Sequence, residues 1–270
     1  MTISTSLFKS FIILNFIASE LRFNCNANNS LQKNLSARPS NRKNSNNSCT
    51  ALVVWGTNLG STTKYGRFTK VVREMIVLPF YHESIVVGLL LSDGWLSLSQ
   101  SNTVKNARLG FKQSLDKFEY VWFVFNVLSH YCERYPYTYS NIRGGKIHPS
   151  ITITTRALPC FTLLYNIFYI DNKKVIPSNI YNILTPVALA HLIMGDGTYR
   201  GGGIRLCTDS YSLQDVVRLI NVLIIRYRLN PTVHTDRGRY RIYIPKNSML
   251  ILIPVVKPHM VPSMLYKLGI

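Results

Sequence analysis

Two short stretches of the chain are near copies of each other, VVGLLLSDG at residues 86–94 and LAHLIMGDG at residues 189–197. Each is an apolar run that ends in Asp-Gly. An apolar run of this length indicates a buried helix, and Asp and Gly are common residues of the turn that follows a helix. One copy alone indicates only a helix end. Two copies in register predict paired helices that present Asp93 and Asp196 at matching ends.

Segments with a basic outer face follow both motifs. Residues 104–113 alternate between polar and apolar side chains, which indicates a half-buried strand. Further strands are expected at residues 151–156, 204–208 and 238–244. The outward polar side chains on these strands are Asn106, Arg108, Lys112, Arg205, Arg239 and Arg241, and Arg200 lies in a connecting loop.

Helices are expected between these strands, so the chain has the pattern of an α+β protein. Thr185 and Pro186 are a favourable N-cap and first residue for the second motif helix. Ser212 and Asp215 suggest a capping box. The two motif regions predict a pseudo-twofold molecule made of two fused half-domains. The expected helices are residues 83–93, 116–134, 185–195, 212–228 and 249–268.

Three segments are expected along the chain: an extension at residues 1–73, a first half-domain at 74–177 and a second at 178–270. The extension has Glu20 as its only acid and is rich in Asn and Ser. Such a stretch buries too little apolar surface to offset its chain entropy, so it is expected to be largely disordered. Its composition fits a transit peptide and equally fits a translated leftover extension.

The charge balance is strongly basic, with 31 Lys and Arg against 12 Asp and Glu and a net charge of +19. This excess indicates a polyanionic partner, either nucleic acid or an anionic membrane surface. The apolar run at residues 7–18 is too short for a bilayer, which needs about 20 residues, so no membrane partner is expected. The five cysteines are scattered without a CxxC pair, which favours reduced thiols over a zinc site or disulfides.

Paired carboxylates have a chemistry of their own. Two carboxylates at adjacent helix ends repel each other unless a divalent cation lies between them. Oxygen ligands suit Mg²⁺, which keeps several waters and needs few protein ligands. A bound cation of this kind promotes hydrolysis of a phosphodiester. Asp93 and Asp196 are therefore predicted to bind Mg²⁺ or another divalent cation.

Both motifs resemble the LAGLIDADG signature, with Asp93 and Asp196 at its eighth position. The resemblance runs from residue 79 to the C-terminus. CTDS at residues 207–210 and KPHM at residues 257–260 resemble proteins encoded in fungal mitochondrial introns. The chain thus resembles a two-motif, single-chain LAGLIDADG homing endonuclease. That family implies a pair of αββαββα half-domains, each with a curved antiparallel sheet, which together form a DNA-binding saddle.

The resemblance also implies roles around the two aspartates. Ser92 and Gly195 stand where the family has Ala or Gly, and their carbonyl oxygens are expected to help coordinate the metal. Gly88 and Ala190 comply with the family's preference for small residues at the helix crossing. His191 is bulkier and is expected at the helix interface, not as a metal ligand.

Catalytic residues on the strands follow from the same resemblance. Gln113 matches the family's strand glutamine, and Thr208 or Asp209 would take its place in the second half. Lys246 resembles the active-site lysine, and Lys257 competes with it for this role. The residues expected to bind DNA are Asn106, Arg108, Lys112, Arg156, Arg200, Arg205, Arg239 and Arg241, and Arg156 could alternatively mirror Lys246 in the first half.

The favoured hypothesis is a monomeric, mitochondrial, site-specific DNA endonuclease of intron homing, with a long asymmetric double-stranded target. One alternative is an RNA maturase that assists splicing of its own group I intron. Another is a catalytically inactive DNA-binding relic. Retention of both aspartates favours cleavage, because a maturase needs the basic surface but not the two carboxylates. The paired motifs disfavour a nonspecific basic structural protein.

Overall fold

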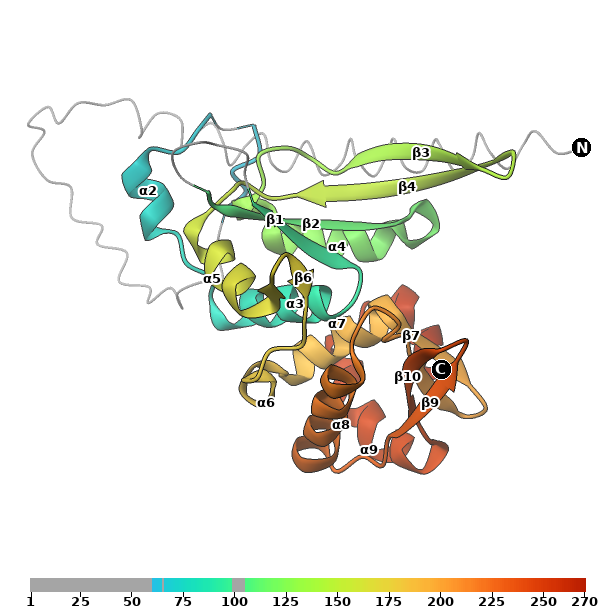
Figure 1. The fold of residues 1–270 in the computed structure, drawn as a ribbon. Coiled ribbons are helices and arrows are strands. Elements are labelled where there is room, and N and C mark those ends of the chain that lie inside the picture. Colours follow the sequence, from blue (N-terminus) through green and yellow to red (C-terminus); the bar gives the residue numbers. More distant parts are fainter. Residues whose placement is uncertain (1–59, 65, 99–104) are drawn as a thin grey trace, which may run out of the picture. The chain divides into compact units, whose positions relative to one another are not determined.

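The computed structural model describes residues 60–64, 66–98 and 105–270 (Figure 1). The expectations for residues 1–59, and the first residue of the strand expected at 104–113, lie outside this range. Among the described residues, no helix has the length and apolar character needed to cross a membrane. Cys132, Cys160 and Cys207 are free thiols.

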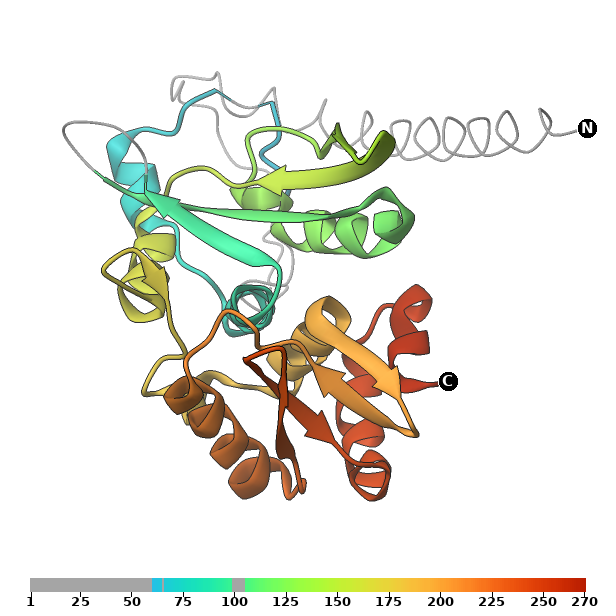
Figure 2. The ribbon, with the colours of Figure 1, turned by 45° about the vertical axis from the view of Figure 1, so that its right-hand side comes forward.

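The first half-domain opens with the motif helix α3, which is followed by two strands, a second helix, two more strands and a third helix. Its sheet has the antiparallel order β1-β2-β4-β3. Helices α3, α4 and α5 contact the strands of this sheet (Figures 1 and 2). The elements are α3 Phe80–Leu91, β1 Gly94–Leu98, β2 Ala107–Ser114, η1 Leu115–Lys117, α4 Phe118–Leu128, η2 Ser129–Tyr131, β3 Tyr137–Arg143, β4 Lys146–Thr154 and α5 Pro159–Phe168.

A short hairpin and the helix α6 connect the halves, and the second half-domain then repeats the order of the first. Its sheet is β7-β8-β10-β9, which matches the first sheet strand for strand. The expected αββαββα pair is therefore confirmed. The elements are β5 Tyr169–Ile170, β6 Lys173–Lys174, α6 Ile180–Ile183, α7 Pro186–Asp196, β7 Gly197–Arg200, β8 Gly203–Leu206, α8 Leu213–Tyr227, β9 Thr232–Asp236, β10 Arg239–Ile244, α9 Lys246–Val256, η3 Lys257–His259 and η4 Pro262–Leu268.

Alternation along the strands divides each sheet into a buried face and an outer face. On β2, Ala107, Leu109 and Phe111 are buried in the core, whereas Arg108 is exposed on the opposite face. On β10, Ile242 and Ile244 are buried in the same way. The helices lie against the buried faces, so the basic side chains of the strands remain on the outer ones.

The expected helix signals at the second half are confirmed in detail. The Thr185 side chain accepts a hydrogen bond from the backbone N–H of Ala188 at 3.1 Å, and Pro186 begins α7. The Ser212 hydroxyl accepts from the backbone N–H of Asp215 at 3.2 Å, and α8 follows. Side-chain oxygens thereby satisfy N–H groups that have no partner within the helix.

The residue pattern did not place strands β3 and β9 or helix α5, although the αββαββα order that the family resemblance implies includes all three. Every residue of β9 is exposed except the half-buried Asp236. Both strands lie at the edge of their sheet, next to only one other strand. An edge strand with two solvent-facing sides has no need for alternating apolar residues, so its sequence carries no period-two signal.

Part of the segment assigned to the N-terminal extension contacts the first half-domain. The Thr62 hydroxyl donates a hydrogen bond to the carbonyl oxygen of His130 at 2.7 Å. The backbone N–H of Lys64 donates to the carbonyl oxygen of Glu133 at 3.0 Å. The boundary expected at residue 73 falls inside the helix α2, Lys70–Met75.

The two halves meet where α3 lies against α7 (Figure 1). A Cβ added to Gly88 would overlap the carbonyl oxygen of Ala188 and the Cβ of His191. The missing side chain therefore lets the two helices approach closely.

We predict that Gly88→Ala lowers the free energy of unfolding by roughly 1–3 kcal/mol, the usual cost of overfilling a core. The neighbouring atoms belong to helix backbone and a Cβ, which cannot turn away. Thermal and urea denaturation would measure the loss. Gly66→Ala is the matched control, because nothing lies within 4 Å of the added carbon there. Equal stability of the two variants would contradict this account of the interface.

Candidate active site

The ends of α3 and α7 bring the two motif aspartates together. A Cβ added to Gly195 would overlap the Ser92 side chain and lie 3.4 Å from Asp93 Oδ2. Asp93 follows Ser92, the C-cap of α3, and is exposed, whereas Asp196 is the last residue of α7 and is half-buried. The close helix crossing thus places Asp93 beside the residue that precedes Asp196.

Hydrogen bonds link Asp93 to a glutamine and a lysine of the first half-domain. Gln113 is buried near the end of β2, and its amide nitrogen donates a hydrogen bond to Asp93 Oδ2. Lys117 Nζ in turn donates to Gln113 Oε1 at 3.2 Å. The structure therefore brings the expected Gln113 to the expected aspartate, and Lys117, which sequence reasoning missed, holds the other end of the amide.

Asp196 lies in a less favourable environment for its charge. Burial, followed by the negative charge of Asp93, raises the pKa of Asp196 from 3.8 to about 7. The positive charges of Lys174, Lys267 and Lys117 oppose this shift without cancelling it. The surroundings of Asp196 therefore disfavour its ionised form.

Two further lysines lie at matching places in the two halves. Lys174 Nζ donates hydrogen bonds to the carbonyl oxygens of Ser92 at 3.1 Å and Gly94 at 2.7 Å. Lys267 Nζ donates to the carbonyl oxygen of Gly195 at 2.6 Å. Burial lowers the pKa of each ammonium to about 8.

Sequence reasoning missed both of these lysines. Each stands near the end of its half-domain, far along the chain from its aspartate. Their distances from the motif aspartates differ between the two halves, so no shared spacing in the sequence identified them. Lys246, expected in this role, is instead the exposed first residue of α9 and lies along Gly202. Lys257 is exposed in η3.

The donor set fits a hard divalent cation. No cluster of three or more His, Cys, Asp or Glu suited to a metal occurs among the described residues. Mg²⁺ needs only one or two carboxylates because it keeps its waters, so Asp93 and Asp196 satisfy that requirement. Burial first, and then the charge of Asp93, raises the pKa of Asp196, and a bound cation would offset both effects by stabilising the ionised carboxylate. The expected carbonyl ligands, on Ser92 and Gly195, already accept hydrogen bonds from lysine.

The second half has no counterpart of Gln113 at Asp196. Thr208 is buried, and its hydroxyl donates to the carbonyl oxygen of Tyr240 at 2.7 Å. Asp209 accepts two hydrogen bonds from Arg241, at 2.8 and 3.0 Å. Neither residue takes the expected place, because each is held by strand β10.

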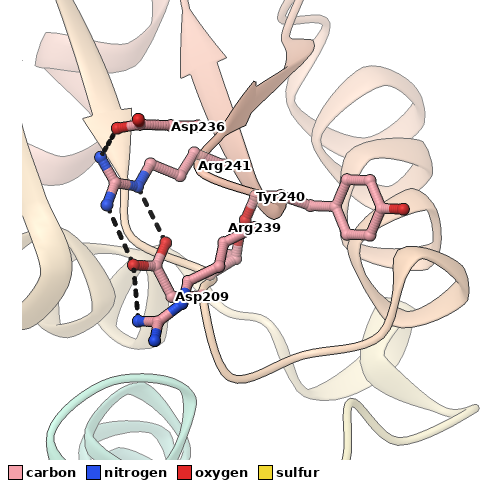
Figure 3. Close-up of polar contacts among 6 residues, drawn as sticks. Asp209, Asp236, Arg239, Tyr240 and Arg241 are labelled. Atoms are coloured by element: carbon pink, nitrogen blue, oxygen red, sulfur yellow. Dashed lines mark hydrogen bonds and ion pairs between the residues drawn. The ribbon is translucent and has the colours of Figure 1, made fainter.

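Two outward arginines of the second sheet, Arg239 and Arg241, are paired with acids (Figure 3). Arg241 bridges Asp209 and Asp236, and Arg239 lies 3.6 Å from Asp209. The Arg241 hydrogen bonds lower the pKa of Asp209. Arg241 was expected to bind DNA, but two carboxylates neutralise its guanidinium in the free protein.

The remaining residues expected to bind DNA divide into two groups. Arg156 is buried, so its guanidinium is not presented to DNA as expected. Its guanidinium donates to the carbonyl oxygens of Gly66 and Thr62 and lies 4.3 Å from the ring centroid of Phe68. The others keep exposed or half-exposed side chains: Asn106, Arg108, Lys112, Arg200, Arg205 and Arg239.

His191 lies at the helix interface, as expected. Its Nδ1 is 3.0 Å from the hydroxyl oxygen of Tyr120, in the buried space beside Gly88. Burial lowers the pKa of His191 to about 3, so the ring is neutral. The residue contributes to the packing beneath the two aspartates.

A family model for the LAGLIDADG DNA endonuclease family matches residues 83–252, which include both motif helices, both sheets and most of α9. The chain belongs to this family. Proteins from several eukaryotes are similar to it over part of their length.

Two of these relatives are cytochrome b mRNA maturases named bI2. The protein from Debaryomyces hansenii is 34% identical over 191 residues, which cover 68% of this chain and 72% of the relative. The protein from Saccharomyces cerevisiae is 33% identical over 199 residues, and the match spans 69% of this chain but only 47% of the relative.

A third relative, the intron-encoded endonuclease ai4 of Dictyostelium discoideum, is 42% identical over 133 residues, 48% of this chain and 82% of its own. Among solved structures, the fold is similar to the homing endonuclease I-WcaI bound to its DNA recognition sequence. The TM-score is 0.68, with 24% identity, over 75% of this chain and 94% of that one.

We predict that Asp196→Asn stabilises the protein in a pH-dependent way. The pKa of Asp196 is raised on folding, so its ionisation costs folding free energy at high pH, and the cost disappears below about pH 4. Without added metal at pH 8, the variant should gain more than about 1 kcal/mol, since each tenfold change in proton affinity corresponds to about 1.36 kcal/mol.

Urea denaturation at pH 4, 6 and 8 would measure this gain, which should grow with pH. Asp116→Asn, an exposed acid on η1, is the matched control and should show no such trend. A gain that is constant across pH would show that the carboxyl is not under strain.

Proposed function

We propose that this protein is a site-specific DNA endonuclease that makes a double-strand break, with Asp93 and Asp196 binding Mg²⁺ or another divalent cation. The observation that carries the proposal is the meeting of two carboxylates and buried lysines at the junction of two basic half-domains. Such a cation, when bound, supplies the Lewis acid for phosphodiester hydrolysis.

Individual residues of the chain have different roles in this reaction. Gln113 fixes Asp93 through its amide, and Lys117 fixes Gln113. Lys174 and Lys267 hold the two backbone segments that carry the aspartates, and their ammonium groups add positive charge where a phosphate approaches. The outer faces of the two sheets bind the DNA duplex, with phosphate contacts giving affinity and base contacts giving specificity.

The biological setting follows from the relatives. An intron-encoded endonuclease and maturases of cytochrome b mRNA are similar to this chain, which supports a role in intron homing within mitochondria. The chain carries both aspartates itself, so it acts as a monomer on a long asymmetric target.

A second function is favoured by one observation. The relatives that are 34% and 33% identical over about two thirds of this chain are both maturases. RNA maturation of its own intron is therefore the second candidate, either alone or beside cleavage. It requires the basic surface and does not require the two carboxylates.

Asp93→Asn and Asp196→Asn should each lower double-strand cutting by at least about 100-fold, because each removes a charge that the cation needs. DNA affinity in EDTA should change little, since phosphate contacts dominate binding. The measurement is cleavage of a plasmid library of intron-insertion sequences, with Mg²⁺ and with EDTA. Binding without metal-dependent cutting by the wild-type protein would move the assignment to a maturase or an inactive relic.

Lys267→Met and Lys174→Met should each lower the rate of cutting by at least about tenfold, with DNA affinity nearly unchanged. Lys70→Met, on the exposed face of α2, is the matched control. Lys246→Met tests whether Lys246, the active-site lysine expected from the sequence, takes part in cutting in place of Lys174 and Lys267. Loss of cutting with Lys246→Met and full activity with both other variants would restore Lys246 as the active-site lysine.

A further inference from the structure

The outer face of the first sheet carries three parallel rows of very different side chains. Strand β4 lies between β2 and β3, and the strand register aligns Lys112 with Thr152 and Thr152 with Tyr137. The next outward pair, Ser150 and Tyr139, is aligned in the same way. We call these rows the basic wall (Arg108, Lys112), the hydroxyl floor (Thr154, Thr152, Ser150) and the tyrosine wall (Tyr137, Tyr139).

The rows form a groove because the middle one is low. Thr152 and Ser150 expose only 5% and 6% of their surface although they point away from the core. Tyr137 and Tyr139 expose 51% and 57% and therefore stand above them. Arg108 is exposed on the opposite side. A groove with cationic groups along one side and aromatic rings along the other suits a nucleic-acid strand.

Lys112 connects the two walls in the free protein. Its ammonium lies 5.5 Å from the centroid of the Tyr139 ring, as a cation–π contact. A base that stacks on this ring takes the place of the ammonium, which then becomes available to the phosphate of the same nucleotide.

A cavity of about 270 Å³ lies at the end of the three rows that holds Arg108, Thr154 and Tyr137. This volume is slightly below that of an ordinary small-molecule pocket, about 300 Å³ or more, and suits a single base. Glu133 supplies an acceptor for the amino group of a base, and the arginines supply donors for a phosphate. The lining residues are Arg108, Glu133, Arg134, Tyr135, Tyr137, Thr154 and Thr155.

The spacing of the tyrosines distinguishes an unpaired strand from a duplex. Alternate residues of a strand are about 7 Å apart. Bases within one strand of a duplex are stacked about 3.4 Å apart, so neighbouring bases could not both lie on these two rings. An extended strand with separated bases matches the spacing, because each base then meets one ring.

We propose that this groove binds an extended, unpaired stretch of nucleic acid, with its phosphates along the basic wall and its bases against the tyrosine wall. The end cavity holds one base of the same stretch. This function goes beyond cleavage of a duplex and needs neither a metal nor the two aspartates. It gives the protein a means of holding unpaired RNA on the same face that meets DNA.

The test is fluorescence anisotropy with labelled ten-nucleotide oligouridylate, oligothymidylate and a blunt duplex, all in EDTA. The double variant Tyr137→Ala/Tyr139→Ala should bind single strands at least about 30-fold more weakly, since stacking typically contributes at least fivefold per base. Tyr137→Phe/Tyr139→Phe should keep most of the affinity, because the rings remain. Tyr181→Ala/Tyr266→Ala is the matched control, since these tyrosines are equally exposed elsewhere.

A second measurement does not depend on the alanine variant folding. An oligonucleotide that contains 2-aminopurine should lose fluorescence when it binds the wild-type protein and stacks on tyrosine. Tighter binding of uridylate would identify RNA as the ligand, and equal binding of both single strands would support unpaired nucleic acid in general. Unchanged affinity in the alanine variant, or an equal loss for the blunt duplex, would overturn the proposal.

Discussion

Helices α3 and α7 meet at Gly88 with no side chain between them, and most of what the molecule presents for chemistry depends on this contact. The same approach sets Gly195 against Ser92 at the far end of the crossing. The two carboxylates therefore lie close together although their negative charges repel each other. Burial, followed by the charge of Asp93, raises the pKa of Asp196, and lysines from three separate elements surround the pair. Tight helix packing thus brings two carboxylates close together, and this pair favours a bound cation.

The two halves do not support their aspartates equally. Asp93 receives the Gln113 amide, whereas the corresponding Thr208 turns to the backbone of β10. The sheets also differ in charge, since acids bind the arginines Arg239 and Arg241 on the second sheet only, within the described part of the chain. A repeated fold therefore presents a different surface in each of its two halves.

The sequence predicted the fold well because its signals are local and repeated. Helix caps at Thr185 and Ser212, and alternation along β2 and β10, depend on neighbouring residues alone. Contacts between distant segments were beyond such signals. Lys267 reaches Gly195 from the last described helix, and Arg156 is buried under residues that sequence composition assigned to an extension. A basic residue at a strand end looks the same in the sequence whether it faces DNA or a carbonyl oxygen.

Helix α3 is buried on nearly every side, from Ser84 to Leu91. Much of that burial is supplied by α7, which lies in the other half of the molecule. During synthesis the first half leaves the ribosome with β1 and α4 against α3, but the face of α3 that packs on α7 stays uncovered until α7 follows. Exposed apolar surface of this kind is what chaperones bind and what aggregation begins from. The packing of α3 against α7, which brings the two aspartates together, therefore also makes complete burial of α3 depend on translation of the second half.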